Sequence, residues 1–270
     1  MAARTPRRPR SRTGPSRISP VILLLASVLI AAAGAGCLSS PPAQPMPDTT
    51  NAASAGQQDD QSIYFFQNVV ANASLTGNRV ALAEDRTAER IRDAIDPINP
   101  ITRDFAVSRI QKAHGGTFNA AQVADLWETV YDGWTYVEDP RGREYFSPAS
   151  RTITLGLKGD CDDFAIVVAS LIEAVGGNAR IIMAGNGTAA HAYPEVYIGT
   201  TQEDYEAVAA YIRERYGVTE VGYHVTRSGN TTRYWLNLDW WSRHPGGKFF
   251  SDTGERVAFY PDGRWERGVS

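Results

Sequence analysis

The sequence has little cysteine: only Cys37 and Cys161 occur in 270 residues. A disulfide framework is therefore excluded as the basis of its stability. The chain also has no internal repeat. With 43% apolar residues it has ordinary globular composition and is long enough to bury a core without disulfides or metals. These features predict one domain of about 200 residues with extensions.

Basic residues are scarce outside the N-terminus. Six of the 27 lysines and arginines fall within residues 1–36, and this segment holds no acidic residue. The rest of the chain has 21 basic against 30 acidic side chains, a net charge of about −9. Nucleic-acid binding needs a basic footprint, so the sequence predicts no nucleic-acid partner.

The apolar run near the N-terminus is short for a membrane-spanning helix. The uncharged stretch 21–36 is somewhat shorter than the ~20 residues that a spanning helix prefers. Arginines before it and small residues after it are typical of a secretory signal. Residues 34–37, Gly-Ala-Gly-Cys, resemble a lipoprotein signal-peptidase site with Cys37 as the lipid-carrying residue. A lipoprotein, an uncleaved anchor and plain secretion remain open; the first two place the domain outside, attached to a membrane.

The chain divides into three predicted parts. Residues 1–37 form the signal, lipoprotein-type or anchor segment. Residues 38–60, which are mainly Pro, Ala, Ser, Gln and Asp, form a flexible linker. Residues 61–270 form the domain, in which helical patterns precede strand-like ones, an order typical of an α+β fold.

The expected elements follow the periodicity of the apolar residues. Helices are expected near residues 62–73, 83–95, 101–114, 120–134, 161–175 and 202–216, with a polar loop at 139–158. Strands are expected near residues 179–184, 191–198, 223–227, 231–239, 257–260 and 264–267. Asn119 and Gln122 are a predicted capping pair, and Gly115-Gly116 is expected to end the third helix.

Cys161 opens a segment with helical apolar spacing over residues 164–175, ended by Gly176-Gly177. The free N–H groups and the dipole of a helix N-terminus favour a thiolate, whereas neighbouring acids oppose it. If Cys37 carries lipid, Cys161 is an unpaired thiol in an exported protein, a candidate reactive group. The alternative is a buried, inert cysteine. Reactivity would require a base.

Two later strands offer that base and its orienter. His191 begins the run 191–198, and Asp239 ends the run 234–239. Cysteine at a helix start, then histidine and aspartate on successive strands, gives a nucleophile, a base and an orienter in chain order. The alternatives are a structural histidine at 191 and a strand-end cap at 239.

Three blocks carry a family resemblance: Gly-Asp-Cys-Asp-Asp at 159–163, His-Ala-Tyr-Pro-Glu-Val at 191–196 and Trp-Leu-Asn-Leu-Asp at 235–239. Together they resemble the core of the transglutaminase-like superfamily over about residues 125–241. The resemblance implies a papain-like α+β fold in which N-terminal helices precede a nucleophile helix packed on an antiparallel sheet. It also implies a Cys161–His191–Asp239 triad in a membrane-anchored or lipoprotein prokaryotic member.

The implied activity is acyl transfer through a Cys161 thioester on peptide or amide substrates in the cell envelope. Hydrolysis by a protease or amidase is favoured over cross-linking because most prokaryotic relatives are thought to be peptidases. The rival hypothesis is a non-catalytic envelope protein, binding or structural, that keeps the fold.

An oxyanion hole is also required. The N–H of Cys161 is one available donor. Trp134 and Tyr136 are weaker candidates that could supply an indole or phenol group; aromatic residues at a helix end otherwise belong to the core.

Clustered carboxylates suit calcium, and Asp160, Asp162 and Asp163 are the acids nearest the thiol. The resemblance includes bacterial proteases that use calcium near the nucleophile. No loop of alternating acidic ligands is present, however, so helix capping is the favoured role and no cofactor is expected.

Overall fold

The computed structural model describes residues 77–139, 144–186 and 189–269. The predicted signal segment, lipidated Cys37, linker and first helix lie outside these residues. Within the described ranges, no helix combines the length and apolar character needed to span a membrane.

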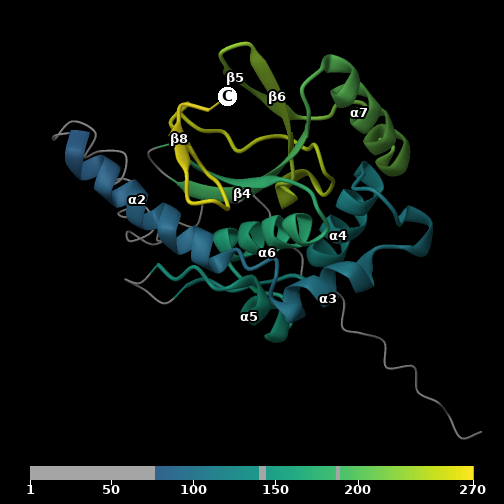
Figure 1. Ribbon diagram of the computed structural model, residues 1–270, viewed down its shortest axis with the longest axis horizontal. Coiled ribbons are helices and arrows are strands. Elements are labelled where there is room, and N and C mark those ends of the chain that lie inside the picture. Colours follow the sequence, from purple (N-terminus) through teal and green to yellow (C-terminus); the bar gives the residue numbers. More distant parts are fainter. Residues whose placement is uncertain (1–76, 140–143, 187–188, 270) are drawn as a thin grey trace, which may run out of the picture. The chain divides into compact units, whose positions relative to one another are not determined.

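An antiparallel sheet of six strands, in the order β5-β6-β4-β3-β7-β8, forms one layer (Figure 1). Its members are β3 (Ala179–Gly185), β4 (Ala190–Gly199), β5 (Tyr223–Ser228), β6 (Thr231–Asn237), β7 (Arg256–Phe259) and β8 (Trp265–Arg267). A separate parallel pair joins β1 (Thr135–Tyr136) to β2 (Lys158–Gly159). In the large sheet, β4 lies between β3 and β6, so the strand that carries the predicted histidine is next to the strand that leads into the predicted aspartate.

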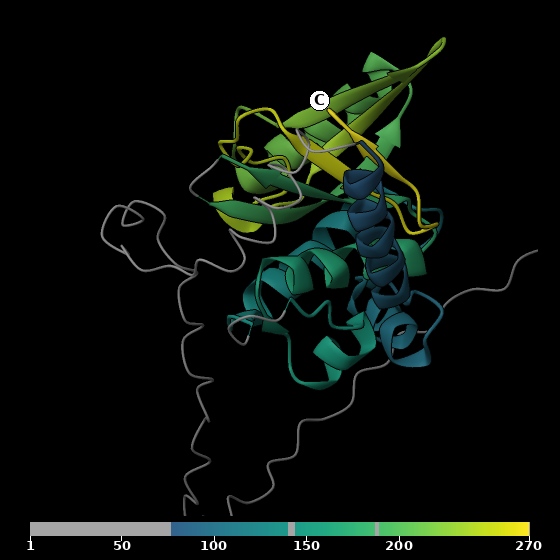
Figure 2. The same ribbon diagram turned by 90° about the vertical axis from the view of Figure 1, so that its left-hand side faces the viewer.

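Helices form the second layer, as the blue and teal ribbons below the green and yellow strands show in Figure 2. They are α2 (Gly77–Ala94), α3 (Pro100–Arg109), α4 (Ala120–Gly133), α5 (Ala149–Thr154) and α6 (Cys161–Ala174), with the 3₁₀ turn η3 (Lys112–His114). The green helix α7 (Gln202–Tyr216) instead packs against β4 and α4, and a second 3₁₀ turn, η4 (Trp240–Ser242), follows β6 (Figure 1). Helix α6 packs on β3 and β4 and is surrounded by α3, α4 and α5. Residues 162–172 are therefore all buried.

The predicted α+β fold, with the nucleophile helix on an antiparallel sheet, is confirmed. Four predicted helices, those of α2, α4, α6 and α7, and all six predicted strands are present near their expected positions. The cap of α4 is also confirmed in part: the Asn119 side chain accepts hydrogen bonds from the N–H groups of Ala121 and Gln122. The Gln122 side chain instead donates to the carbonyl of His114.

Two predictions about the connections were wrong. The polar segment before Cys161 contains β2 and α5, whose N-terminus is tied by Ser150 to Asp96. The third helix ends at Arg109 instead of at Gly115-Gly116. The physical reason is the buried Asp125 carboxylate, which binds the backbone N–H of Gln111 and the ring of His114 and so holds the chain out of the helix.

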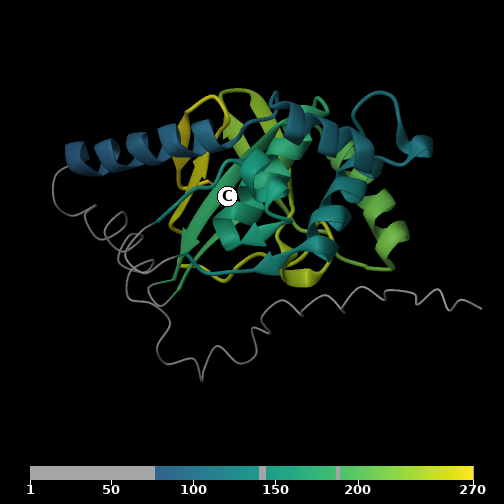
Figure 3. The same cartoon turned by 90° about the horizontal axis from the view of Figure 1, so that it is seen from below.

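Helix α2 runs beside the yellow C-terminal strands (Figure 3). The indole N–H of Trp265 on β8 donates to the Asp85 carboxylate at 2.8 Å. Buried Glu84 on the same helix forms an ion pair with Arg267. These contacts tie the first described helix to the last strand.

Candidate functional site

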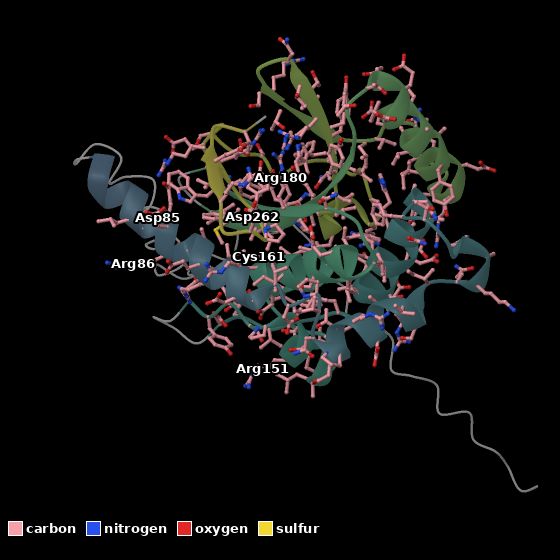
Figure 4. All side chains as sticks on the ribbon, viewed as in Figure 1. Asp85, Arg86, Arg151, Cys161, Arg180 and Asp262 are labelled. Atoms are coloured by element: carbon pink, nitrogen blue, oxygen red, sulfur yellow. The ribbon has the colours of Figure 1, made fainter. Side chains whose placement is uncertain are left out.

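Cys161 lies at the N-terminal end of α6, where Figure 4 labels it. The preceding Asp160 occupies the N-cap position without a capping bond from its own side chain. The carboxylate of Asp163 instead accepts hydrogen bonds from the N–H groups of Asp160 and Ser147, the latter at 3.1 Å. A Cβ atom at Gly159 would lie 2.1 Å from Asp163 Oδ2. Glycine is therefore required for this turn into the helix.

His191 and Asp239 form a buried pair. His191 is the second residue of β4, and Asp239 lies two residues beyond the end of β6. Because Glu195 pairs with Asn237 in this antiparallel register, the two chains bring residues 191 and 239 to the same end of the strands. The Nε2 atom of His191 lies 2.9 Å from Oδ2 of Asp239. This bond leaves Nδ1 as the ring nitrogen that can serve Cys161.

The thiol of Cys161 is hydrogen-bonded to β4 at Ala192, the residue after His191. The backbone N–H of Ala192 donates a hydrogen bond to the Cys161 sulfur. No hydrogen bond within the described ranges joins this sulfur directly to the His191 ring. The start of α6 is thus hydrogen-bonded to the residue that follows His191 on β4.

Aromatic rings surround the imidazole of His191. Ring centroids of Trp240, Trp241 and Phe250 lie 5.3, 5.8 and 5.4 Å from it. Trp240 presents its ring nearly perpendicular to His191 and also contacts Phe164 of α6 edge-on. Such packing restricts the imidazole ring to few orientations.

The two aromatic oxyanion candidates lie in different surroundings. Tyr136 is half-buried, and burial followed by the nearby Cys161 raises the pKa of its phenol. Its hydroxyl therefore stays protonated and is a possible donor beside the thiol. Trp134 is buried against Phe164, and its indole N–H has no partner among the described groups.

Acidic side chains crowd the other side of the thiol. Burial, Asp160 and Asp162 raise the pKa of Cys161 well above its usual range, while the Ala192 N–H lowers it. Burial and Asp160 likewise raise the pKa of Asp162 well above the usual carboxyl range. Burial and Asp160 also raise the pKa of Glu144 to about 7. In the resting site, the thiol is therefore held in its neutral form.

The acidic residues beside Cys161 have ligand atoms close enough together to hold a cation. Ligand atoms of Asp160, Cys161 and Asp162 lie within 4.8 Å of one another. Oδ1 of Asp160 and Oδ2 of Asp162 are buried and accept no hydrogen bond from a described residue. Two facing carboxylates with no donor between them need either a shared proton or a cation. Carboxylate oxygens suit calcium.

Glu195 belongs to the same sequence block as His191, but its carboxylate is bonded to residues outside the triad. Its carboxylate is fully buried, 2.7 Å from Nε of Arg180 and 2.5 Å from Nδ1 of His224. Figure 4 labels Arg180 on the sheet, away from the start of α6. The guanidinium stacks 4.2 Å above the ring of Trp235. Glu195 is therefore part of a buried ionic network.

Several neighbours of the site were missed by the sequence analysis. Trp240 and Trp241 directly follow Asp239, so an aromatic pair beside a candidate triad residue was an available signal. The sulfur contact of Ala192 carries no side-chain signal because it comes from the backbone. Phe250 lies far from His191 in the sequence, and the two rings come together only in the folded chain.

Comparison with known proteins finds a match to one family model. Residues 106–206 match the sequence model described as the "Transglutaminase-like superfamily"; this stretch contains Cys161 and His191 but not Asp239. One solved structure, described as a "Putative Cysteine Protease from Cytophaga hutchinsonii", is 24% identical, with a TM-score of 0.30. That alignment covers 36% of this chain and 33% of the other, so it spans about a third of that protein. No curated protein sequence matches the chain.

Proposed function

Because residues 106–206 match the model of the transglutaminase-like superfamily, which supports a cysteine-dependent enzyme, we propose that this chain performs acyl transfer through Cys161. The observation that carries the proposal is the 2.9 Å bond between His191 Nε2 and Asp239 Oδ2 beside the thiol-bearing helix end. This bond supports assigning the base and its orienter.

The proposed reaction begins with a neutral thiol. Nδ1 of His191 takes the proton as the Cys161 sulfur attacks the carbonyl carbon of a peptide or amide. Asp239 keeps the ring hydrogen on Nε2 and stabilises the imidazolium. The imidazolium then gives its proton to the departing amine, which leaves a thioester. Water, deprotonated by His191, releases the acid and restores the thiol.

The tetrahedral intermediates need donors for their oxyanion. The N–H of Cys161 lies in the first turn of α6, where N–H groups have no partner within the helix. The Tyr136 hydroxyl, near the thiol and protonated, is the better placed of the two aromatic candidates. Trp134 has its indole packed against Phe164 and is the weaker one.

Substrate and location complete the proposal. Hydrolysis is favoured over cross-linking on family grounds, which makes the protein a protease or amidase for peptides or proteins of the cell envelope. The basic N-terminus, the apolar stretch 21–36 and Cys37 support export and attachment to a membrane by a lipid or an anchor.

The first test is the alkylation rate of Cys161 as a function of pH in the full-length protein. Burial and the adjacent acids raise the thiol pKa, so rapid alkylation near pH 7 requires a local base. We expect His191→Ala to slow alkylation at pH 7 on the order of 10²-fold.

His244→Ala is the matched control, because that ring binds the carbonyl of Pro245 outside the triad. It should leave the profile unchanged. Slow alkylation that is insensitive to His191→Ala would contradict the catalytic proposal and favour a non-catalytic envelope protein with this fold.

We also propose that calcium binds Asp160 and Asp162, supported by their buried, unpartnered oxygens. A bound cation would supply positive charge that offsets the carboxylates opposing the thiolate. Added calcium is then expected to raise the melting temperature, since a ligand that binds only the folded state stabilises it by about 2.7 kcal/mol at 100 times its Kd.

Asp160→Asn should abolish this calcium-dependent shift in a thermal melt. Glu203→Gln is the control, because Glu203 is an exposed acid in the first turn of another helix, α7. An identical melting temperature with calcium and with a chelator would refute the calcium site and leave a shared proton between the two acids.

A further inference from the structure

The Asp239 carboxylate has a single partner. Oδ2 is bonded to His191, whereas Oδ1 is buried and accepts no hydrogen bond from any residue that the structure describes. Asp239 precedes η4 without capping it through its side chain. With no second bond to fix the carboxylate, its direction depends on the backbone from which it projects.

Two side chains outside the triad hold that backbone, and we propose that Trp127 and Asn237 are positioning residues for the Asp239–His191 pair. The inference rests on the proposed function and deepens it. Neither residue touches the reacting atoms; each binds the chain within two residues of Asp239.

Trp127 reaches the site from α4. Its indole N–H donates to the carbonyl of Leu238 at 2.7 Å, across 111 residues of sequence. The N–H of Leu238 in turn donates to the carbonyl of Pro194 on β4 at 3.0 Å. The indole is 1% exposed and stacks on Tyr131 with centroids 4.7 Å apart. Leu238 is thus held through both its carbonyl and its N–H by buried neighbours.

Asn237 binds the N–H side of the peptide that joins Leu238 to Asp239. Its Oδ1 accepts the N–H of Asp239 at 3.0 Å, and its amide N–H group donates to the carbonyls of Gly247 and Lys248. The side chain is fully buried. It therefore joins the chain that carries Asp239 to the segment that follows η4. A hydrophobic residue of similar size would leave these buried groups without partners.

The consequence is a prediction about geometry. A carboxylate with one bond follows any tilt of its backbone, and a displacement of about 1 Å in a catalytic group can cost on the order of 10²-fold in rate. Loss of one backbone anchor, with the other retained, should have a smaller effect.

Trp127→Phe removes the indole N–H and keeps an aromatic ring in the core. In the full-length protein we expect the His191-dependent part of Cys161 alkylation to fall on the order of 10-fold. The ¹⁵N NMR signals of His191, one of only four histidines, should shift toward a mixture of ring tautomers. A merely structural residue would lower the melting temperature and leave both signals unchanged, and that result would overturn the proposal.

Trp265→Phe is the matched control, since it also removes an indole N–H bonded to an oxygen, Oδ1 of Asp85, but on β8. It should not alter the His191 signals. Asn237→Ser is the second variant, because a hydroxyl cannot bind Asp239 and the 247–248 carbonyls together. It tests the proposal even if Trp127→Phe fails to fold, and the same two readouts decide it.

The proposed function and the positioning role of Trp127 and Asn237 can be disproved separately. If the wild-type protein shows no His191-dependent alkylation, the proposed function fails, while the NMR comparison still reports whether Trp127 orients His191. If the wild type alkylates as expected and both folded variants match it, the function stands and the positioning role is wrong.

Discussion

Replacing Asp239 with asparagine is expected to lower the rate of acyl transfer by about 10⁴-fold while the fold is retained. A carboxylate can only accept a hydrogen bond, so Asp239 Oδ2 keeps the ring hydrogen of His191 on Nε2 and leaves Nδ1 free for the thiol proton. An amide can instead donate to Nε2, which moves the ring hydrogen to Nδ1. That tautomer cannot take a proton from Cys161, and the imidazolium also loses its counter-ion.

The measurement is turnover of a peptide or amide that the wild-type enzyme accepts, with Cys161 alkylation as a substrate-free readout. The control is Asp125→Asn, which makes the same change at another buried aspartate, 2.7 Å from the ring of His114. It should lower stability but leave the alkylation profile intact. Wild-type turnover in Asp239→Asn would remove Asp239 from the mechanism.

The sequence predicted the elements of the site because their signals are local. The helix of Cys161 has continuous apolar spacing, and residues 191 and 239 each lie at the end of a strand-like run. Chain order then suggested which three residues meet. The α+β fold followed from helices preceding strands, and the antiparallel order of the sheet is what brings two of the three together.

The unpredicted parts depend on contacts between distant residues. Trp127 on α4 reads in sequence as one more apolar residue of a helical stripe; its bond to Leu238 exists only once α4 packs beside the end of β6. The early end of α3 depends in the same way on Asp125, which lies in the next helix. The size of the increase in the Cys161 pKa was also not predicted, because burial strengthens the effect of Asp160 and Asp162 on the thiol.

The resting thiol and the triad place opposite demands on the same site. Burial and the neighbouring carboxylates favour neutral Cys161, whereas the proposed reaction needs this thiol to give its proton to His191. The balance suits proton transfer at the moment of attack rather than a permanent ion pair. A cation at Asp160 and Asp162 would move this balance toward the thiolate, so calcium and pH should affect alkylation together.

Glu195→Gln is expected to destabilise the domain by about 3–5 kcal/mol, the usual cost of leaving a buried charge without its partner. Although burial raises the pKa of Glu195, Arg180 and His224 outweigh it and hold that pKa below its usual range. The carboxylate is therefore ionised at neutral pH, and its stabilising effect is lost as the pH falls through the acid range. Denaturant titration at neutral pH measures the change.

Two comparisons separate this structural role from a catalytic one. Glu206→Gln removes a carboxylate that pairs with Arg213 at 3.2 Å on the surface, and it should cost at most about 1 kcal/mol. Replacing Glu195 and Arg180 together with methionine should restore most of the stability lost by Glu195→Gln, because neither charge is then left alone. If Glu195→Gln kept full stability but lost His191-dependent alkylation, Glu195 would have a catalytic role. Its role in stabilising the buried ionic network would then be refuted.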